Sequence, residues 1–247
     1  MASGLVLQNI KKTYHGKRGN VEALKGVTFD IQPGEFFGLL GPNGAGKSTL
    51  INILAGSVGK TGGQASVLGI DLDTDPQALK YLIGVVPQEV AFDPFFTVER
   101  TLRFQFGYYN QPVDEVYLDE ILTRLSLKDK KDIKPRMLSG GMKRRLMIAK
   151  ALIHKPKVLI LDEPTAGVDV ELRHELYDLV RELNKNGTTV ILTSHYLEEV
   201  ELLCERVAII NKGELVALDH KDKLKEQFKM AKLEDVFLEL TKKPLTS

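Results

Sequence analysis

The sequence lacks the features of a secreted, disulfide-linked or membrane-spanning protein. Its single cysteine, Cys204, excludes an internal disulfide, and a reducing compartment such as the cytoplasm is the simplest interpretation. The longest apolar runs, such as Val158–Leu161 and Val207–Ile210, fall far short of the ~18 residues that a membrane span requires. Residues Met1–Asn9 show no basic segment followed by an apolar one, so we expect no secretory signal there.

A charge excess is also absent. Lysine and arginine number 34 against 33 aspartate and glutamate residues, a formal net charge of +1. General nucleic-acid-binding proteins usually carry a marked basic excess, so this balance argues against nucleic acid as a partner. The length of 247 residues suffices for one large domain or two small ones.

Short apolar runs alternate with helix-length amphipathic segments, a pattern typical of an α/β fold. We expect strands at Leu5–Ile10, Leu24–Ile31, Glu35–Leu40, Gln64–Leu68, Ile83–Val86, Val158–Leu161, Thr188–Thr193 and Arg206–Ile210. We expect helices at Lys47–Ala55, Pro76–Tyr81, Val113–Ser126, Gly140–Ile153, Val170–Asn184 and Tyr196–Cys204. Residues 89–154 show no convincing strand and are predicted to be an inserted helical subdomain. Residues 221–247 are predicted to be a helical tail whose interleaved lysines and acidic residues form a solvated face, with a partner site as the alternative.

A phosphate-binding loop is the strongest local signal. The pattern G-x-x-x-x-G-K-[ST] lies between an expected strand and an expected helix, and comprises Gly41, Pro42, Asn43, Gly44, Ala45, Gly46, Lys47, Ser48 and Thr49. Glycines let successive backbone N–H groups point inward, and the helix N-terminus adds partial positive charge. We expect Lys47 to reach the β- and γ-phosphates of a nucleotide, and Ser48 to offer its hydroxyl to Mg²⁺.

Two adjacent carboxylates end a strand that is predicted to be buried. Asp162 and Glu163 follow the apolar run Val158–Leu161, and burying a carboxylate is costly unless it faces a cation or a reacting group. Such a pair by itself often only caps a helix. In a chain that also has a phosphate-binding loop, we expect Asp162 to hold Mg²⁺ and Glu163 to accept a proton from an attacking water.

A second helix start also carries glycines that suit anion binding. Ser139 is a good N-cap for the helix that follows it, but capping does not account for Gly140 and Gly141. Two such helix starts in one chain suggest a nucleotide that is bound from two sides.

The segment Leu138–Met142 resembles the signature motif of the ATP-binding cassette (ABC) superfamily, and the other motifs of that superfamily follow in order over about residues 5–220. Tyr14 resembles the aromatic residue that stacks on adenine, and Gln88 resembles the glutamine of the Q-loop. Pro164–Asp169 resembles the D-loop, and His195 resembles the switch histidine. The resemblance implies a P-loop NTPase core with an antiparallel β subdomain and an inserted α-helical subdomain, within an ATP-binding domain over residues 1–220.

The same resemblance implies a mechanism with ATP and Mg²⁺ as cofactors. Two copies of the chain pack head to tail, and each ATP lies between Gly41–Thr49 of one copy and Ser139–Gly141 of the other. The implied catalytic residues are Glu163 as general base, His195, which contacts the γ-phosphate and orients the water, and Gln88, which also binds the metal ion. Asp169 links the two sites.

Within the superfamily, the chain is similar to ATP-binding subunits of bacterial exporters of the daunorubicin-resistance and YadG-like type. That likeness is carried by Met137–Leu152, Leu161–Asp169, Ser194–Cys204 and Leu233–Leu240. Met142 in place of the commoner glutamine, and Gly167-Val168-Asp169 in place of Ala-Leu-Asp, depart from the general pattern and fit the exporter group.

An exporter subunit implies an integral membrane permease as its partner, on the cytoplasmic side of the inner membrane, contacted through the region Gln88–Tyr109. Seven of the 17 aromatic residues lie between Phe92 and Tyr109. Some of them must form the core of the helical subdomain. Because a proline-bearing turn seldom buries three aromatics, we expect Phe95 or Phe96 to anchor the partner.

Other interpretations stay open. The chain could be an importer ATPase subunit or a soluble ABC ATPase that acts on nucleic acid or ribosomes, whereas a small-molecule kinase has no use for Leu138–Met142. Tyr14, expected in an exposed loop, either stacks on adenine or packs locally. His195 by itself would more often be a capped core histidine.

Overall fold

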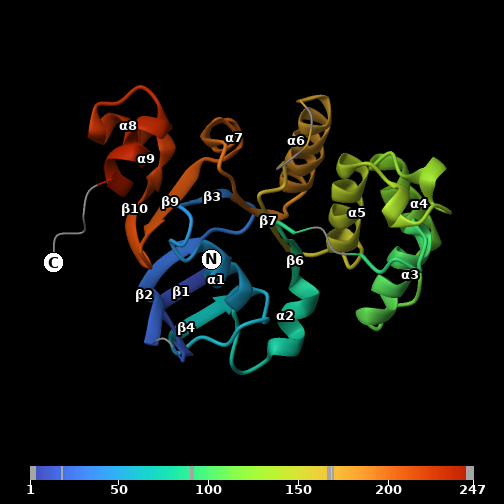
Figure 1. The fold of residues 1–247 in the computed structure, drawn as a ribbon, viewed down its shortest axis with the longest axis horizontal. Helices are drawn as coiled ribbons and strands as arrows, with labels where there is room; N and C mark the ends of the chain where they lie inside the picture. The colour runs from blue at the N-terminus through green and yellow to red at the C-terminus, as the bar shows by residue number, and fades with distance from the viewer. Residues whose placement is uncertain (1–3, 18, 90–91, 166–167, 169, 243–247) are drawn as a thin grey trace.

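Two β-sheets and a lobe of helices make up the computed structural model, which describes residues 4–17, 19–89, 92–165, 168 and 170–242 (Figure 1). The first sheet is antiparallel, in the order β2-β1-β4-β5. Its strands are β1 (Leu5–Gly16), β2 (Gly19–Ile31), β4 (Gly62–Val67) and β5 (Ile70–Asp71). Strands β1 and β2 form a long hairpin whose tip is exposed and whose base is buried.

The second sheet positions the candidate site. Its order is β10-β9-β3-β8-β7-β6, and all neighbours are parallel except β10, which is antiparallel to β9. The strands are β3 (Phe36–Leu40), β6 (Ile83–Val86), β7 (Val158–Asp162), β8 (Thr189–Thr193), β9 (Arg206–Asn211) and β10 (Glu214–His220). Parallel strands end at the same edge of a sheet, so the loops after β3, β6, β7 and β8 leave the sheet together.

The helical lobe lies on the other side of β6 and β7 from the antiparallel sheet (Figure 1). It contains α3 (Val98–Tyr108), α4 (Glu115–Arg124), two short 3-10 helices at Lys128–Lys130 and Pro135–Met137, and α5 (Gly140–Leu152). Polar side chains cap each of the three α-helices at its N-terminus, because Thr97, Asp114 and Ser139 accept a hydrogen bond from a backbone N–H three residues further on.

The remaining helices surround the two sheets. They are α1 (Lys47–Leu54), α2 (Pro76–Leu82), α6 (Val170–Lys185), α7 (Leu197–Leu203), α8 (Lys221–Phe228) and α9 (Leu233–Lys242). Helices α8 and α9 lie beside β10, at the opposite end of the molecule from the helical lobe (Figure 1).

Strand β3 separates two hydrophobic cores. Phe36 and Leu40 pack into the core shared with the helical lobe, whereas Phe37 and Leu39 pack into the core between the two sheets. This alternation is the two-residue period of a strand that is buried on both faces. Every residue of β3, β7 and β8 is buried, which explains why these strands read as continuous apolar runs.

The predicted α/β class, with an antiparallel sheet and a helical insertion, is confirmed. One expectation about a single element is wrong. Strand β1 extends to Gly16, so Tyr14 lies on a strand and not in a loop. The expected helical tail forms α8 and α9, and the apolar face of α9 buries Leu233 and Val236 completely.

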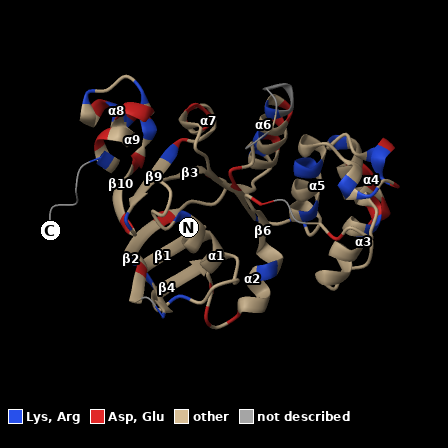
Figure 2. Ribbon diagram, viewed as in Figure 1, with Lys and Arg blue, Asp and Glu red and all other residues tan. Residues whose placement is uncertain are grey.

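The surface carries charges of both signs, in agreement with the nearly equal numbers of acidic and basic residues in the sequence. Acidic and basic residues are interspersed on α4, α6 and α8 (Figure 2). Among the described residues, no helix has both the length and the apolar character needed to cross a bilayer. Cys204 is fully buried as a small apolar side chain, and burial raises the pKa of its thiol well above the usual range.

Candidate active site

The predicted phosphate-binding loop connects β3 to α1 at the carboxyl edge of the second sheet. Gly46 has a φ of +112°, and a Cβ at this position would lie 2.6 Å from the carbonyl oxygen of Ala23, so only glycine fits. Lys47 folds back into the loop, and its Nζ donates to the carbonyl oxygens of Gly41 at 2.6 Å and Pro42 at 3.2 Å. The loop therefore surrounds the ammonium group of Lys47, on the side where a phosphate would bind.

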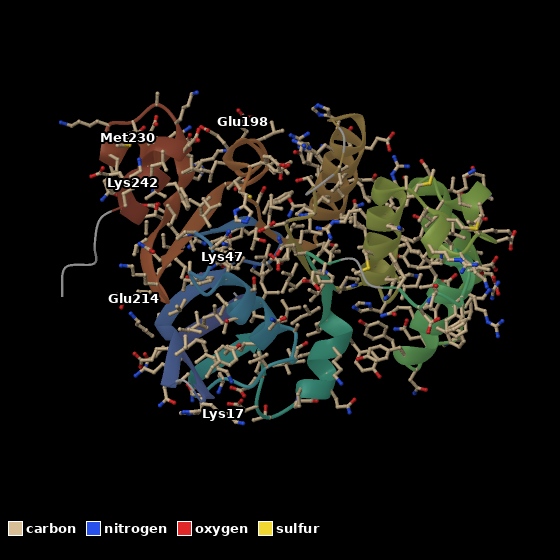
Figure 3. The ribbon with its side chains drawn as sticks, viewed as in Figure 1. Lys17, Lys47, Glu198, Glu214, Met230 and Lys242 are labelled. Atoms are coloured by element: carbon tan, nitrogen blue, oxygen red, sulfur yellow. The ribbon has the colours of Figure 1, made fainter. Side chains whose placement is uncertain are left out.

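A cleft of about 430 Å³ opens over this loop, a volume suited to a small-molecule ligand. It is lined by Val21–Ala23, Lys25, Asn43–Thr49, Gln88, Glu163 and Lys212. Lys47 is 7% exposed and lies in the middle of the molecule, unlike Lys17 at its rim (Figure 3). Burial lowers the pKa of Lys47, and the negative charges of Glu163 and Asp162 oppose that shift.

The three predicted catalytic residues contact one another at the edge of this cleft, which Gln88 and Glu163 line and His195 does not. The amide Nε2 of Gln88 donates to Oε2 of Glu163 at 2.7 Å, and Nε2 of His195 lies 2.5 Å from Oε1 of Glu163. They come from the loops that follow β6, β7 and β8. The Glu163 side chain is 11% exposed, whereas that of His195 is 45% exposed. The site thus holds a largely buried carboxylate with a neighbour at each oxygen.

Glu163 has an unusual backbone conformation for a residue with a side chain. Its φ of +50° lies in the left-handed region, which costs an L-residue roughly 1–2 kcal/mol. Its N–H donates to the carbonyl oxygen of Thr193 at 3.0 Å and to the hydroxyl oxygen of Thr193 at 3.2 Å. Conformations of this kind persist where neighbouring contacts enforce them, and they cluster at functional sites.

The predicted metal ligands lie at and beneath the cleft. Ser48 and Gln88 line it, while Asp162 is 8% exposed and accepts a hydrogen bond from the hydroxyl of Thr193 at 2.5 Å. The described residues contain no group of three or more His, Cys, Asp or Glu side chains that could hold a metal. This sparse set of oxygen and amide donors fits Mg²⁺, which usually keeps several waters and takes phosphate oxygens as ligands.

Tyr14 lies on the wall that leads into the cleft. It pairs directly with Val21 across the β1–β2 hairpin, and Val21 lines the cleft. Directly opposed residues of an antiparallel pair share one face of the sheet. The Tyr14 ring is 40% exposed, with Nζ of Lys12 4.8 Å from its centroid, so part of the ring can receive a stacking base.

The glycine-rich start of α5 does not reach this cleft. The hydroxyl of Ser139 accepts a hydrogen bond from the N–H of Met142 at 3.2 Å, and both Ser139 and Gly140 are exposed. Neither of these residues nor Gly141 lines the cleft, since α5 belongs to the helical lobe (Figure 1). The second anion-binding element therefore faces outward. Asp169, predicted to link two such sites, lies outside the described residues.

Two buried charged residues behind the catalytic loops were not singled out from the sequence. Arg144 is 4% exposed on α5 and contacts the loops that carry Gln88 and Glu163. Glu199 is 3% exposed on α7 and accepts hydrogen bonds from hydroxyls on three segments, those of Thr165 at 2.5 Å, Tyr177 at 2.7 Å and Ser194 at 2.8 Å. The available signal was weak, because a charge inside an amphipathic helix usually faces solvent.

The helical tail also reaches this edge of the sheet. A hollow of about 160 Å³ beside the start of the phosphate-binding loop is lined by Gly41–Asn43, Ser194, His195, Leu197 and Phe237. Phe237 belongs to α9, so the helical tail contributes an apolar side chain to this hollow. The hydrophobic spacing of Leu233, Val236 and Phe237 was the signal for a packed helix.

A separate groove of about 520 Å³ runs between the end of α1, helix α2 and the end of α3. Tyr108 and Tyr109 form its wall on the helical lobe, and Leu79 belongs to the opposite wall. Tyr108 is 65% exposed, and Phe95, in the turn before α3, is 76% exposed. The region predicted to contact a partner, Gln88–Tyr109, thus borders the groove, and its residues 90–91 lie outside the described residues.

Comparison with known proteins gives a consistent result. The family model described as "ABC transporter" matches residues 24–166. The linearmycin resistance ATP-binding protein LnrL of Bacillus subtilis is 43% identical over 222 residues, which cover 89% of this chain and 70% of that protein. The Nod factor export ATP-binding protein I of Burkholderia thailandensis is 40% identical over 212 residues, which cover 85% of this chain and 68% of that protein.

Solved structures agree with the sequence relatives. The ATP-binding subunit of an ABC transporter superimposes with a TM-score of 0.88 at 28% identity, over 96% of this chain and 99% of that one. A dimeric bacterial ABC transporter cassette, MJ0796, gives a TM-score of 0.80 at 28% identity, over 87% of this chain and 98% of that one. The same cassette has also been solved as a dimer in a post-hydrolysis state with ADP and phosphate.

Proposed function

Because the chain belongs to the ABC transporter family of ATP-binding proteins, we propose that it is the ATP-hydrolysing subunit of a bacterial exporter and drives a separate membrane permease. It is an ATPase of that family. One observation carries the catalytic assignment: Gln88 and Glu163 line the cleft over the phosphate-binding loop and contact each other, and His195 contacts the Glu163 carboxylate from the hollow beside that cleft. Export is supported by relatives whose names refer to antibiotic resistance and to export.

In the proposed reaction, the cleft binds ATP with Mg²⁺. The loop Gly41–Thr49 would hold the phosphates through its backbone N–H groups and Lys47, and Ser48 and Gln88 at the cleft, with Asp162 beneath it, would hold the metal ion. Tyr14 stacks on the adenine. When bound, ATP supplies the phosphoryl group that is transferred, and Mg²⁺ neutralises part of the negative charge on its phosphates.

Glu163 performs the proton transfer in this proposal. Its carboxylate accepts the proton of the attacking water, a contribution of roughly 10²–10⁴-fold to the rate. His195, on the solvent side of that carboxylate, contacts the γ-phosphate and orients the water, and Gln88 orients the carboxylate from the other oxygen. Positioning of this kind supplies most of the catalysis of phosphoryl transfer.

The complete site needs two copies of the chain. Ser139 and Gly140 are exposed, and neither they nor Gly141 line the cleft of their own chain, which supports a role in binding the nucleotide of a second copy. In a head-to-tail homodimer, each ATP is enclosed by the phosphate-binding loop of one copy and the start of α5 of the other, with Asp169 at the interface. The dimeric cassettes that share this fold support the arrangement.

The groove between α1, α2 and α3 is the proposed docking site of the permease. Exposed aromatic side chains beside a groove are typical of protein interfaces. Tyr108 lines the groove and is exposed, and Phe95 is exposed outside its lining, in the turn before the other end of α3. Phe96 is less suited to the anchoring role, because its ring packs on Phe104 at 4.5 Å. Docking at this groove places the chain at the cytoplasmic face of the inner membrane as a peripheral subunit.

Affinity purification of the tagged chain from detergent-solubilised membranes tests this assignment. We expect a stoichiometric partner with several membrane spans, identified by mass spectrometry. Replacing Phe95 and Tyr108 together by alanine should reduce recovery of the partner by about tenfold, a loss of roughly 1.4 kcal/mol. Val116→Ala, at a residue that is 80% exposed on α4, is the matched control and should leave recovery unchanged.

Two outcomes would contradict the exporter assignment. Recovery of soluble proteins alone, together with rapid ATP hydrolysis by the isolated chain, would indicate a soluble ABC ATPase. Recovery of a permease that also binds an external solute-binding protein would indicate an importer.

A further inference from the structure

Arg144 is a buried arginine that uses every N–H of its guanidinium. It lies on α5, five residues after the cap Ser139, and is 4% exposed. Its Nε donates to the carbonyl oxygen of Pro164 at 2.7 Å. One terminal nitrogen, Nη1, donates to the carbonyl oxygens of Pro87 at 2.6 Å and Gln88 at 3.2 Å. The other, Nη2, donates to the carbonyl oxygen of Asp162 at 3.0 Å and to that of Glu163.

These five acceptors belong to two catalytic loops. Pro87 and Gln88 follow β6, whereas Asp162, Glu163 and Pro164 lie at the end of β7 and just beyond it. A guanidinium offers five donors in one rigid plane, so a single side chain can fix both loops. A lysine offers only three donors around one point and cannot reproduce that geometry.

We propose that Arg144 is a positioning residue for ATP hydrolysis, which fixes the Gln88 loop and the Glu163 loop to each other and to the helix that begins at Ser139. The inference rests on the proposed catalytic role of Glu163. It assigns to α5 a second function besides anion binding at its N-terminus.

The backbone conformation of Glu163 explains why its loop needs the hydrogen bonds of Arg144. Its left-handed φ of +50° is unfavourable, so the peptide groups on either side must be restrained. Thr193 on β8 holds the N–H of Glu163, and Arg144 holds its carbonyl oxygen. Without Arg144 the peptide after Glu163 is free to turn toward commoner conformations, and the carboxylate then leaves its place between Gln88 and His195.

Burying the Arg144 guanidinium is costly, so its hydrogen bonds to the two loops must offset that cost. Removing a cation from water is costly, and burial lowers the pKa of Arg144 while the carboxylates of Asp162 and Glu163 oppose that shift. Five carbonyl dipoles repay part of that cost. An apolar residue at position 144 would avoid the cost altogether but would leave five carbonyl oxygens without this donor.

Arg145 provides a matched control on the same helix. It is the next residue, carries the same side chain, and donates to Glu175 on α6 and to the carbonyl oxygen of Leu125 at 3.4 Å. It contacts neither catalytic loop through these bonds. Changes at positions 144 and 145 therefore remove the same chemical group from the same helix and differ in what that group holds.

The test compares Arg144→Gln, Arg144→Lys and Arg145→Gln in the full-length chain. Phosphate release as a function of ATP concentration gives kcat and KM, and a fluorescent trinitrophenyl-ATP probe gives nucleotide affinity. We expect Arg144→Gln to lower kcat by roughly 10²-fold, because small misplacements of a catalytic group have effects of that size. KM and probe affinity should stay within about threefold, since the phosphate-binding loop is not held by Arg144. Arg144→Lys should be intermediate, and Arg145→Gln should stay close to wild type.

Chemical rescue separates a positional role from a merely structural one. Arg144→Ala leaves a buried hole lined by carbonyl oxygens, so millimolar guanidinium should restore part of kcat, whereas sodium chloride at equal ionic strength should not. If Arg144→Ala does not fold, Arg144→Gln and Arg144→Lys decide the question by the kcat criterion above.

The proposal is overturned if folded Arg144→Gln keeps kcat within threefold of wild type, if nucleotide affinity falls as much as kcat does, or if Arg145→Gln has the same effect. Glu163→Gln is measured in parallel. Unchanged turnover in that variant would refute the catalytic role of Glu163, whatever the Arg144 variants show, so the two failures can be told apart.

Discussion

Glu163 concentrates several restraints on one residue. Gln88 and His195 contact its two carboxylate oxygens, and Thr193 and Arg144 hold its backbone N–H and carbonyl groups. As the proposed general base, Glu163 is held in position and needs little reorganisation during the reaction, which is a main source of enzymatic rate enhancement. A substitution of this side chain is therefore expected to remove ATP hydrolysis without unfolding the chain.

Glu163→Gln should abolish hydrolysis while ATP binding is retained. The amide occupies the same volume and can still contact Gln88, but it cannot accept a proton. We expect kcat to fall by roughly 10²–10⁴-fold, with nucleotide affinity within a few-fold of wild type. Steady-state phosphate release and equilibrium binding of ATP measure the two quantities, and size-exclusion chromatography should show an ATP-bound dimer. Undiminished turnover would remove Glu163 from the mechanism.

Single site residues can be predicted from the sequence where their type and their place after a strand indicate a chemical role. The phosphate-binding loop, Gln88, Glu163 and His195 stand out because each follows an expected strand, and parallel strands end together. Arg144 does not stand out, because its acceptors are backbone carbonyls that any residue can supply. The strand position of Tyr14 is likewise hidden, since the exposed tip of a hairpin lacks the alternation that marks a half-buried strand.

Between elements, His154 joins the helical lobe to the second sheet. It follows α5, is 5% exposed, and its ring stacks on that of Tyr109 with centroids 3.8 Å apart. Nε2 lies 3.1 Å from the carbonyl oxygen of Ile83, so this nitrogen carries the proton. The other nitrogen, Nδ1, is buried and has no hydrogen-bond partner. Burial lowers the pKa of His154 to about 4, because protonation would place an unpaired N–H and a charge in this junction.

This junction should weaken as the pH falls. The folded chain keeps His154 neutral down to about pH 4, whereas an unfolded chain takes up the proton near pH 6.5, so protons favour unfolding between those values. The stability is present above about pH 6.5 and is lost toward pH 4, by at most about 1.4 kcal/mol per pH unit. Urea unfolding at pH 7.5 and pH 5 should show a smaller loss for His154→Phe, which keeps the stacking. Equal losses in both proteins would contradict this account.

Elements with strong flanking signals were predicted well, and weakly patterned ones were not. Helices α1 and α5 begin at glycine-rich motifs, and β7 is a continuous apolar run, so their positions follow from the sequence. Strand β10 was missed because all seven of its residues are half-buried, which leaves neither an alternating nor an apolar pattern. The packing of α9 depends on contacts with α7 and α8 that only the folded chain shows.

For the whole molecule, the outward-facing start of α5 means that one chain holds half of each proposed ATP site. Mixing two defective variants tests this directly. Lys47→Ala impairs the phosphate-binding loop, and Gly140→Asp places a negative charge at the start of α5, so each variant alone should be nearly inactive. In a 1:1 mixture, half of the dimers are mixed and each contains one intact site, so roughly a quarter of the wild-type sites should reappear.

Phosphate release from the mixture, compared with each variant alone at the same total concentration, measures that recovery. A mixture that is only as active as the mean of its components would show that each site is completed within one chain. Lys47→Ala alone, at the total protein concentration of the mixture, is the control for background activity that depends only on protein concentration.

The strand order of the second sheet has a consequence for how the chain is made. Strand β3, which leads into the phosphate-binding loop, pairs with β8 and β9 and with no strand that precedes it among those described. A ribosome therefore finishes the loop long before it supplies either neighbour, and at roughly 5–20 residues per second the delay is on the order of ten seconds. During that interval the nascent chain contains the phosphate-binding loop but lacks the strands β8 and β9 that hold β3 in the sheet. A short apolar strand stays unpaired for that time, and unpaired strand edges make incompletely folded chains prone to aggregation.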